Sequence, residues 1–182
     1  MKSRRKILGG AIAAALAFTA GVTTMAPTAS AVSVQTVGLV PAISGTPGVS
    51  VATMAGLQFA VRAAHAGTFS TVEQWDIIKP SGVDYVFLES RYMLTGQVHR
   101  LDASASPNNT TVPKFGDPVG TRPVDYHRDS QRWKMEKSID GTVSFKNVLS
   151  GYTLEYAGPG SNPAFVQKKA AFSSHKFVLK NL

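Results

Sequence analysis

The side chains that perform catalysis or bind metals are few in this chain and widely spaced. There is no cysteine, so the chain has neither a thiol nucleophile nor a thiolate metal ligand. It has no Gly-x-Ser-x-Gly segment of the kind that exposes a nucleophilic serine. The four histidines match no metal-ligand spacing; they are His65, His99, His127 and His175. We therefore predict that the chain is not an enzyme and uses no metal or cofactor.

The acidic residues suggest no reaction either. Asp117, Asp125 and Asp129 lie close enough in sequence to approach one cation, but their spacing fits no known loop such as the EF-hand. The two carboxylates of a glycoside hydrolase meet in space rather than in sequence, so the sequence leaves that arrangement open. Because the acids are scattered over turns, solubility and turn formation explain them more simply.

Residues 1–31 have the composition of an export signal. Basic residues between positions 2 and 6 precede an apolar segment at 7–22, and Ala29-Ser30-Ala31 matches a small-x-small cleavage site. We predict a signal peptide that is cut before Val32, and hence a secreted bacterial protein. The apolar segment is too short to favour a permanent membrane span. Arg4-Arg5 also fits a twin-arginine signal, so that route and ordinary secretory export both stay open.

The mature chain, residues 32–182, has the length of one domain. Without the four basic residues of the leader it has 15 Lys and Arg against 11 Asp and Glu, a net charge of +4. No long basic run remains, which argues against nucleic-acid binding. We predict a flexible mature N-terminus with a first strand at 32–47, followed by one domain at 48–182.

Short runs of alternating apolar and polar residues fill the mature chain. Trp133 and Met135 share one side of a predicted strand, since strand side chains alternate between two faces. Asp140-Gly141 predicts a tight hairpin turn, after which residues 143–147 resume the alternation. No long helical periodicity interrupts this pattern, which therefore predicts an all-β protein.

Similar segments recur three times. Each begins with an apolar-x-apolar segment that leads to a glycine turn: Val49-Ser50-Val51, Val86-Phe87-Leu88 and Val143-Ser144-Phe145. Each closes with an aromatic residue that an aliphatic residue follows two positions later: Trp75 and Ile77, Trp133 and Met135, Phe177 and Leu179. We interpret the three aromatic residues as core anchors that pack around a pseudo-threefold axis.

These motifs resemble those of the ricin B-type β-trefoil lectins. Gln131-Arg132-Trp133 resembles the Gln-x-Trp motif of that family, and residues 145–155 resemble its repeat start with Asn, Ser-Gly and Leu-Asp. Glu73-Gln74-Trp75 and His175-Lys176-Phe177 are weaker copies. The resemblance implies a β-trefoil of three repeats and a non-catalytic protein that binds carbohydrate. The chain departs from the family in having no cysteine and in a longer second repeat, where we place an insertion at 104–128.

The resemblance also implies where a sugar binds. In the family a carboxylate accepts hydrogen bonds from sugar hydroxyls, an aromatic face covers the sugar, and an amide closes the polar edge. In the second repeat these positions fall on Asp102, Phe115 and Gln131, with Ser130 beside the amide and Tyr126 and His127 as candidates from the insertion. The alternative is that Asp102 caps a turn and Phe115 belongs to the core.

The other repeats match less well. Glu155, Gln167 and His175 imply a weaker second site in the third repeat, where Glu155 stands in place of the family's aspartate. The first repeat has Phe59-Ala60 in place of Leu-Asp, so we predict that it does not bind.

Two other functions fit a β-trefoil. The segment 104–128 contains four prolines and suits the stiff loop of a protease inhibitor, because a preorganised loop loses less entropy on binding. The second of these functions is that of a protein-interaction module that binds no small ligand. Under either of these, Asp102→Ala is predicted to destabilise the fold by no more than about 1 kcal/mol, the scale of a lost cap.

Overall fold

The computed structural model describes residues 32–42, 49–53, 61–65, 68–94, 96–104, 112–158, 165–168 and 173–182. The predicted signal peptide at 1–31, Phe59-Ala60 and residues 105–111 lie outside these ranges. Within them the chain forms strands and short 3-10 helices: β1 Val32–Pro41, β2 Val49–Thr53, β3 Val61–His65, η1 Thr71–Glu73, β4 Gln74–Pro80, β5 Phe87–Ser90, β6 His99–Asp102, β7 Gly120–Pro123, η2 Asp129–Gln131, β8 Trp133–Lys137, β9 Val143–Asn147, β10 Thr153–Tyr156, β11 Phe165–Lys168, η3 Ser173–His175 and β12 Phe177–Asn181.

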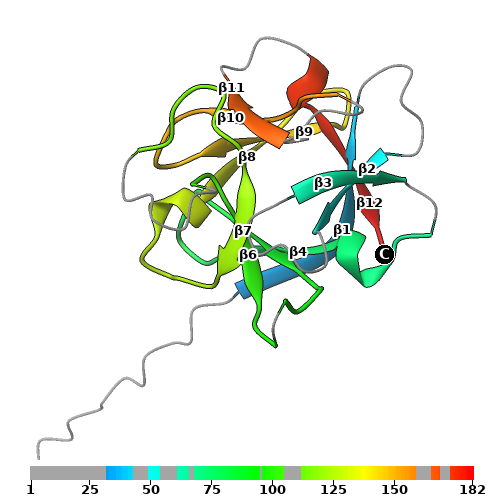
Figure 1. Cartoon of the computed structure of the whole chain (residues 1–182), viewed down its shortest axis with the longest axis horizontal. Coiled ribbons are helices and arrows are strands. Elements are labelled where there is room, and N and C mark those ends of the chain that lie inside the picture. The colour runs from blue at the N-terminus through cyan, green and yellow to red at the C-terminus, as the bar shows by residue number, and fades with distance from the viewer. Residues whose placement is uncertain are drawn as a thin grey trace, which may run out of the picture.

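Six of these strands close into a barrel (Figure 1). β1 pairs with β4 and β12, β4 pairs with β5, and β9 pairs with β8 and β12, always antiparallel. The ring closes between Val86, next to β5, and Trp133 of β8, whose backbones exchange hydrogen bonds of 2.8 and 3.0 Å. Closure gives every strand of the ring two neighbours, which satisfies the backbone groups that an open sheet leaves at its edges.

Three hairpins complete the fold. β2 pairs with β3, β6 with β7, and β10 with β11. Figure 1 shows the three hairpins at separate corners around the barrel. Each repeat therefore gives two strands to the barrel and two to a hairpin, and the protein is a β-trefoil, as the sequence predicted.

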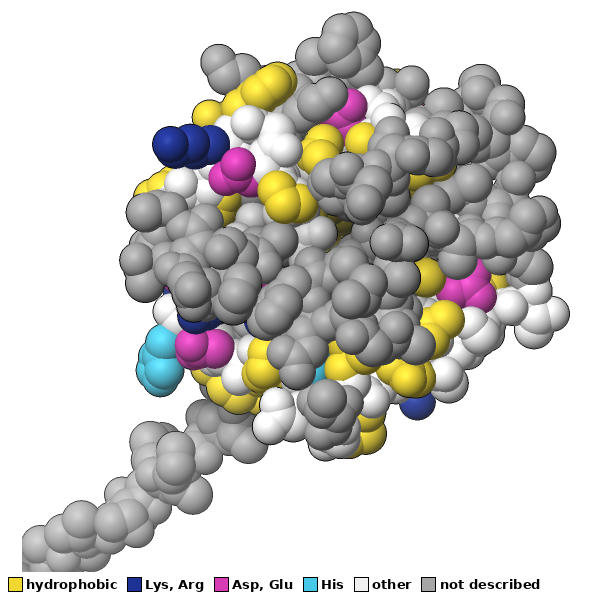
Figure 2. All heavy atoms as spheres, viewed as in Figure 1, with side chains coloured by type: hydrophobic (Ala, Val, Ile, Leu, Met, Phe, Trp, Pro, Cys, Tyr) yellow, Lys and Arg dark blue, Asp and Glu magenta, His cyan; other side chains and the backbone are white. Residues whose placement is uncertain are grey.

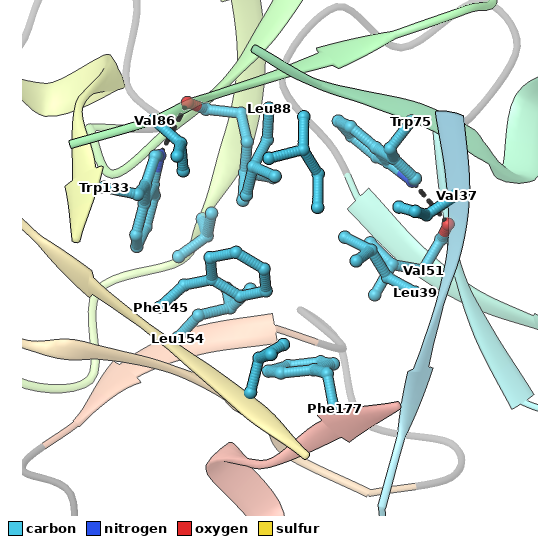
Figure 3. Close-up of a cluster of buried hydrophobic side chains, with 14 of the residues drawn as sticks. Val37, Leu39, Val51, Trp75, Val86, Leu88, Trp133, Phe145, Leu154 and Phe177 are labelled. Atoms are coloured by element: carbon cyan, nitrogen blue, oxygen red, sulfur yellow. Dashed lines mark hydrogen bonds between the residues drawn. The ribbon is translucent and has the colours of Figure 1, made fainter. Parts of the chain in front are cut away.

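Three equivalent sets of side chains fill the barrel (Figure 3). They are Val37, Leu39, Trp75 and Ile77 in the first repeat, Val86, Leu88, Trp133 and Met135 in the second, and Val143, Phe145, Phe177 and Leu179 in the third. Trp75, Trp133 and Phe177 are fully buried, which confirms that they are core anchors.

The two tryptophans also tie hairpins to the barrel. Trp75 Nε1 donates a hydrogen bond of 2.8 Å to the carbonyl of Val51, and Trp133 Nε1 donates one of 3.1 Å to that of Leu101. A buried indole N–H needs such an acceptor. The side chain of Phe177 has no N–H group, so the anchor of the third repeat cannot donate a hydrogen bond of this kind.

The first repeat begins at β1, and not at Val49 as the sequence pattern suggested. Val49 and Val51 belong to the hairpin strand β2, where Val51 occupies the position of Leu101 in the second repeat. Hairpin strands also bury alternate apolar residues, so they imitate a repeat start. β1 pairs with two barrel strands and belongs to the trefoil, which therefore starts before the predicted boundary at residue 48.

The predicted insertion at 104–128 is only in part an addition to the fold. It contains β7, which pairs with β6 from Asp102↔Gly120 to His99↔Pro123. The long connection is thus residues 103–119. The segment after β7, residues 124–128, returns the chain to η2 and lies against the candidate site.

Candidate functional site

Asp102 ends β6 and points into the protein. The side chain is fully buried, and Oδ1 accepts hydrogen bonds from Ser104 N at 2.8 Å and Ser104 Oγ at 2.7 Å. Oδ2 accepts one of 3.2 Å from Gln131 Nε2. The two bonds to Ser104 fix the turn after β6, so Asp102 caps this turn, as the alternative interpretation of the sequence proposed. The carboxylate offers no surface to a ligand in this structure, so the predicted direct contact between Asp102 and a sugar is not formed here.

Two arginines lie over this carboxylate. Arg122 Nε is 3.8 Å and Arg128 Nη1 is 3.6 Å from Asp102 Oδ2. Arg122 Nε also donates a hydrogen bond of 2.7 Å to the carbonyl of Ser104. Burial lowers the pKa of Arg122, and Asp102 opposes that shift because a neighbouring anion favours the charged guanidinium. The buried carboxylate is therefore the counter-ion that holds Arg122 and Arg128 in place.

Gln131 and Ser130 are buried beside Asp102. The Gln131 amide donates hydrogen bonds to Asp102 and to the carbonyl of Pro123 at 2.9 Å, and its oxygen accepts one of 3.0 Å from Asp125 N. The carbonyl of Ser130 accepts hydrogen bonds from Ala103 N and from Asn147 Nδ2. The structure thus brings Asp102, Ser130 and Gln131 together. Asp102 and Gln131 support the loop that follows β7, whereas Ser130 links the end of β6 to Asn147 of β9.

That loop borders an open hollow of about 460 Å³, lined by residues 122–128. Tyr126 and His127, both candidates from the sequence, line it and are exposed, Tyr126 at 65%. Asp125 is beside them: Oδ1 accepts a hydrogen bond of 2.9 Å from His127 N, and Oδ2 is 3.8 Å from Arg128 Nε. The hollow therefore presents an aromatic ring, an imidazole, a carboxylate and a guanidinium to a ligand.

Phe115 lies elsewhere. It belongs to the turn from Lys114 to Asp117, in which Asp117 N donates to the carbonyl of Lys114 and Gly116 has a positive φ of 85°. The ring is 58% exposed and makes an edge-to-face contact with Tyr152 of the third repeat, with centroids 6.3 Å apart. Because β7 begins only at Gly120, Phe115 precedes the strand that faces Asp102. It is neither in the hollow nor in the core.

The third repeat places Glu155 and His175 near one another. Burial lowers the pKa of His175, while the negative charge of Glu155 acts in the opposite direction. Gln167 lies on β11 and pairs through its backbone with Leu154; its side chain is outside the described part of the structure. In the first repeat Glu73 accepts a hydrogen bond from Ser50 Oγ of β2. The residue that starts each Gln-x-Trp copy thus interacts with the first strand of its own hairpin.

Sequence reasoning missed Asp125, Arg122 and Arg128 as parts of the site. The available signal was the density of charged residues around Tyr126 and His127, which the Gln-x-Trp resemblance does not single out. Among the residues coloured on the face that Figure 2 shows, acidic and basic side chains are interspersed with apolar ones.

Within the described ranges no group of three or more His, Cys, Asp or Glu side chains is arranged to hold a metal ion. No helix in that part of the chain is long and apolar enough to cross a membrane.

Comparison with known proteins supports the fold. No protein-family model and no curated protein matches the sequence. Among solved structures, the designed threefold symmetric protein ThreeFoil matches with a TM-score of 0.64 at 20% identity, over 81% of this chain and 99% of that one. A Polyporus squamosus lectin bound to a sialylated epitope matches with a TM-score of 0.61 at 14% identity, over 81% of this chain and 49% of that one. SeviL bound to asialo-GM1 saccharide matches with a TM-score of 0.56 at 14% identity, over 82% of this chain and 98% of that one. At these identities the likeness establishes the β-trefoil fold alone.

Proposed function

We propose that this protein is a secreted, non-catalytic carbohydrate-binding protein with one site in the second repeat, at the hollow of residues 122–128. The observation that carries the proposal is the exposed Tyr126 ring beside the Asp125 carboxylate and His127. A sugar needs a flat apolar partner for its C–H face and charge-assisted hydrogen bonds for its hydroxyls. Two proteins of the same fold, the Polyporus squamosus lectin and SeviL, have structures with bound saccharides, which supports this class of ligand.

The roles differ from those that the family resemblance implies. Asp125 takes the part of the ligand-facing carboxylate, and Tyr126 that of the aromatic platform. Asp102 and Gln131 position the loop from below through Arg128 and through the backbone of Asp125. The weaker site at Glu155, Gln167 and His175 stays a prediction.

A single shallow hollow binds weakly. A millimolar dissociation constant corresponds to about −4 kcal/mol, so useful binding requires a multivalent glycan or several copies of the protein. Of the segment 104–128 on which the inhibitor alternative rests, β7 and residues 124–128 pack onto Asp102 and Gln131, so a protruding inhibitory loop would have to come from the rest of that segment.

The test is a glycan array with residues 32–182, which hold all of the described structure. Tyr126→Ala should abolish binding, and Phe115→Ala is the matched control because it removes an aromatic ring of similar exposure outside the hollow. Selective binding that Tyr126→Ala removes and Phe115→Ala retains supports the proposal. A blank array from folded protein refutes it for the glycans tested, and loss of binding in Phe115→Ala alone moves the site to Phe115 and Tyr152.

A further inference from the structure

A second hollow lies on the outer face of the barrel, across β1, β4 and β5. It has a volume of about 490 Å³, and its apolar walls are Val32, Val34, Ile78, Pro80, Tyr85 and Phe87. Strand register explains how they meet. Val34 pairs with Ile78, Ile78 pairs with Phe87, and Val32 pairs with Pro80. Because Val37 and Ile77 point into the barrel, these neighbours point outward.

An outward face of this kind is normally polar, yet here Val32 is 54% and Val34 is 59% exposed. These two exposed valines adjoin the apolar walls of the hollow, so an apolar ligand group there would cover them. Its volume lies within the range of small-molecule sites, and its lining comes mainly from three strands.

The polar end of this hollow is an arginine–glutamate pair. Arg100 is almost fully buried, with its guanidinium carbon 3.7 Å from the centre of the Phe87 ring and 4.5 Å from that of Tyr126. Nε and Nη2 of Arg100 donate to Glu89 Oε1 at 2.8 and 2.5 Å. Nη1 is buried and has no hydrogen-bond partner among the described residues. A buried donor in this state favours a ligand that brings an oxygen acceptor.

Charge narrows the class of ligand. Glu89 and Arg100 neutralise one another, and the other side chains that line this hollow are uncharged. The site therefore favours a neutral apolar group over a charged one, with an oxygen at the end next to Arg100.

Tyr126 connects the two hollows, since it lines both of them. We infer that they form one extended site and that its ligand is a glycoside with an apolar aglycone. The sugar occupies the hollow of residues 122–128, the aglycone lies over Val34, Ile78 and Phe87, and an oxygen of the ligand accepts a hydrogen bond from Arg100. This inference rests on the proposed carbohydrate function and adds to it the chemistry of the group that is attached to the sugar.

The test compares the methyl and octyl glycosides of the sugar that the array selects, by titration calorimetry and by amide NMR, below the critical micelle concentration of the octyl glycoside. We expect the octyl glycoside to bind about tenfold more tightly or better, as burial of a few methylene groups allows. Amide shifts at residues 32–34 and 85–89 should appear with the octyl glycoside only.

Val34→Ser should narrow the octyl-to-methyl affinity ratio about threefold or more and leave methyl glycoside binding unchanged. Val112→Ser is the matched control, because Val112 is 55% exposed and lies outside both hollows, and it should leave the ratio unchanged. Equal affinity for the two glycosides overturns the extended site and leaves carbohydrate binding intact. Binding of neither glycoside overturns the carbohydrate function and this extension together.

Discussion

Replacing Asp102 by alanine is expected to destabilise the protein by about 3–5 kcal/mol, several times the loss of a turn cap. The carboxylate is fully buried, accepts two hydrogen bonds from Ser104, and lies 3.8 Å from Arg122. Arg122 is only 7% exposed, so without Asp102 its charge stays buried and loses the anion that opposes it. Arg128 is 35% exposed and can turn to water, so it adds little to the total.

Urea unfolding followed by tryptophan fluorescence measures this loss, because Trp75 and Trp133 are both buried in the folded state. The midpoint should fall while the slope with urea stays unchanged. Asp117→Ala is the matched control: Asp117 Oδ2 accepts a hydrogen bond of 2.6 Å from Lys114 N in an exposed turn, and the expected loss there is about 1 kcal/mol or less.

Equal and small losses at Asp102 and Asp117 would refute the argument from the buried ion pair and restore the capping estimate made from the sequence. A double-mutant cycle gives an independent check. Arg122→Met in the Asp102→Ala background removes the second buried charge, so part of the stability should return. The same reasoning makes Asp102→Ala a poor test of sugar binding, because it disturbs the loop that carries Tyr126 without any ligand contact of its own.

Three further predictions concern stability. Gly38→Ala should destabilise by about 1–3 kcal/mol in thermal unfolding, because a Cβ there would lie 2.1 Å from the Phe69 ring. Trp133→Phe should lose about 1–2 kcal/mol in urea unfolding, since the hydrogen bond to the Leu101 carbonyl is removed from a buried site. His175 should make stability pH-dependent: burial lowers its folded pKa below 6.5, so its contribution is complete above that pH and is lost as the pH falls below it. His175→Gln should flatten the fall between about pH 7 and pH 5.

Each of these has an outcome that contradicts it. In the Phe69→Ala background, Gly38→Ala should cost less stability, because the ring that the new Cβ would meet is absent. An unchanged cost would show that the Phe69 ring is not its cause. The loss of stability in Trp133→Phe is compared with that in Phe177→Leu, because the Phe177 side chain has no N–H group and so no hydrogen bond to lose. A wild-type protein whose stability does not change across that pH range would contradict the burial argument for His175.

The fold could be predicted because its signals are local. Trp75, Trp133 and Phe177 stand at the same place in each repeat, and an aliphatic residue two positions later marks the same strand face. The start of the first repeat could not, because Val37-Gly38-Leu39 of β1 and Val49-Ser50-Val51 of the hairpin strand β2 share the same apolar-x-apolar pattern, and only the strand pairing shows which of them belongs to the barrel.

The site was harder to predict, for a related reason. Sequence identifies Asp102 as a carboxylate at the right place, but whether it faces solvent depends on Arg122 and Arg128, which the second hairpin brings over it. The length of the connection between β6 and β7 sets where β7 begins, and nothing local in the sequence fixes that register. Phe115 was therefore assigned to the sugar site, although the strand that faces Asp102 begins only five residues later, at Gly120.

Comparing the three repeats separates what builds the fold from what is left for binding. In each repeat the residue two positions before the core anchor interacts with the first strand of its own hairpin: Glu73 with Ser50 and Gln131 with Asp102 through hydrogen bonds, and His175 with Glu155 through charge. An interaction that recurs in all three repeats is explained by the architecture that they share. The exposed Tyr126 does not take part in these recurring interactions. It lies where two hollows meet, and its ring is not needed to close the core. The ring packs on Arg100 and Phe87 from outside the barrel and still leaves most of its surface in water. An aromatic surface exposed at the junction of two hollows is best explained by a ligand, so this departure from the threefold pattern is the place to look for function.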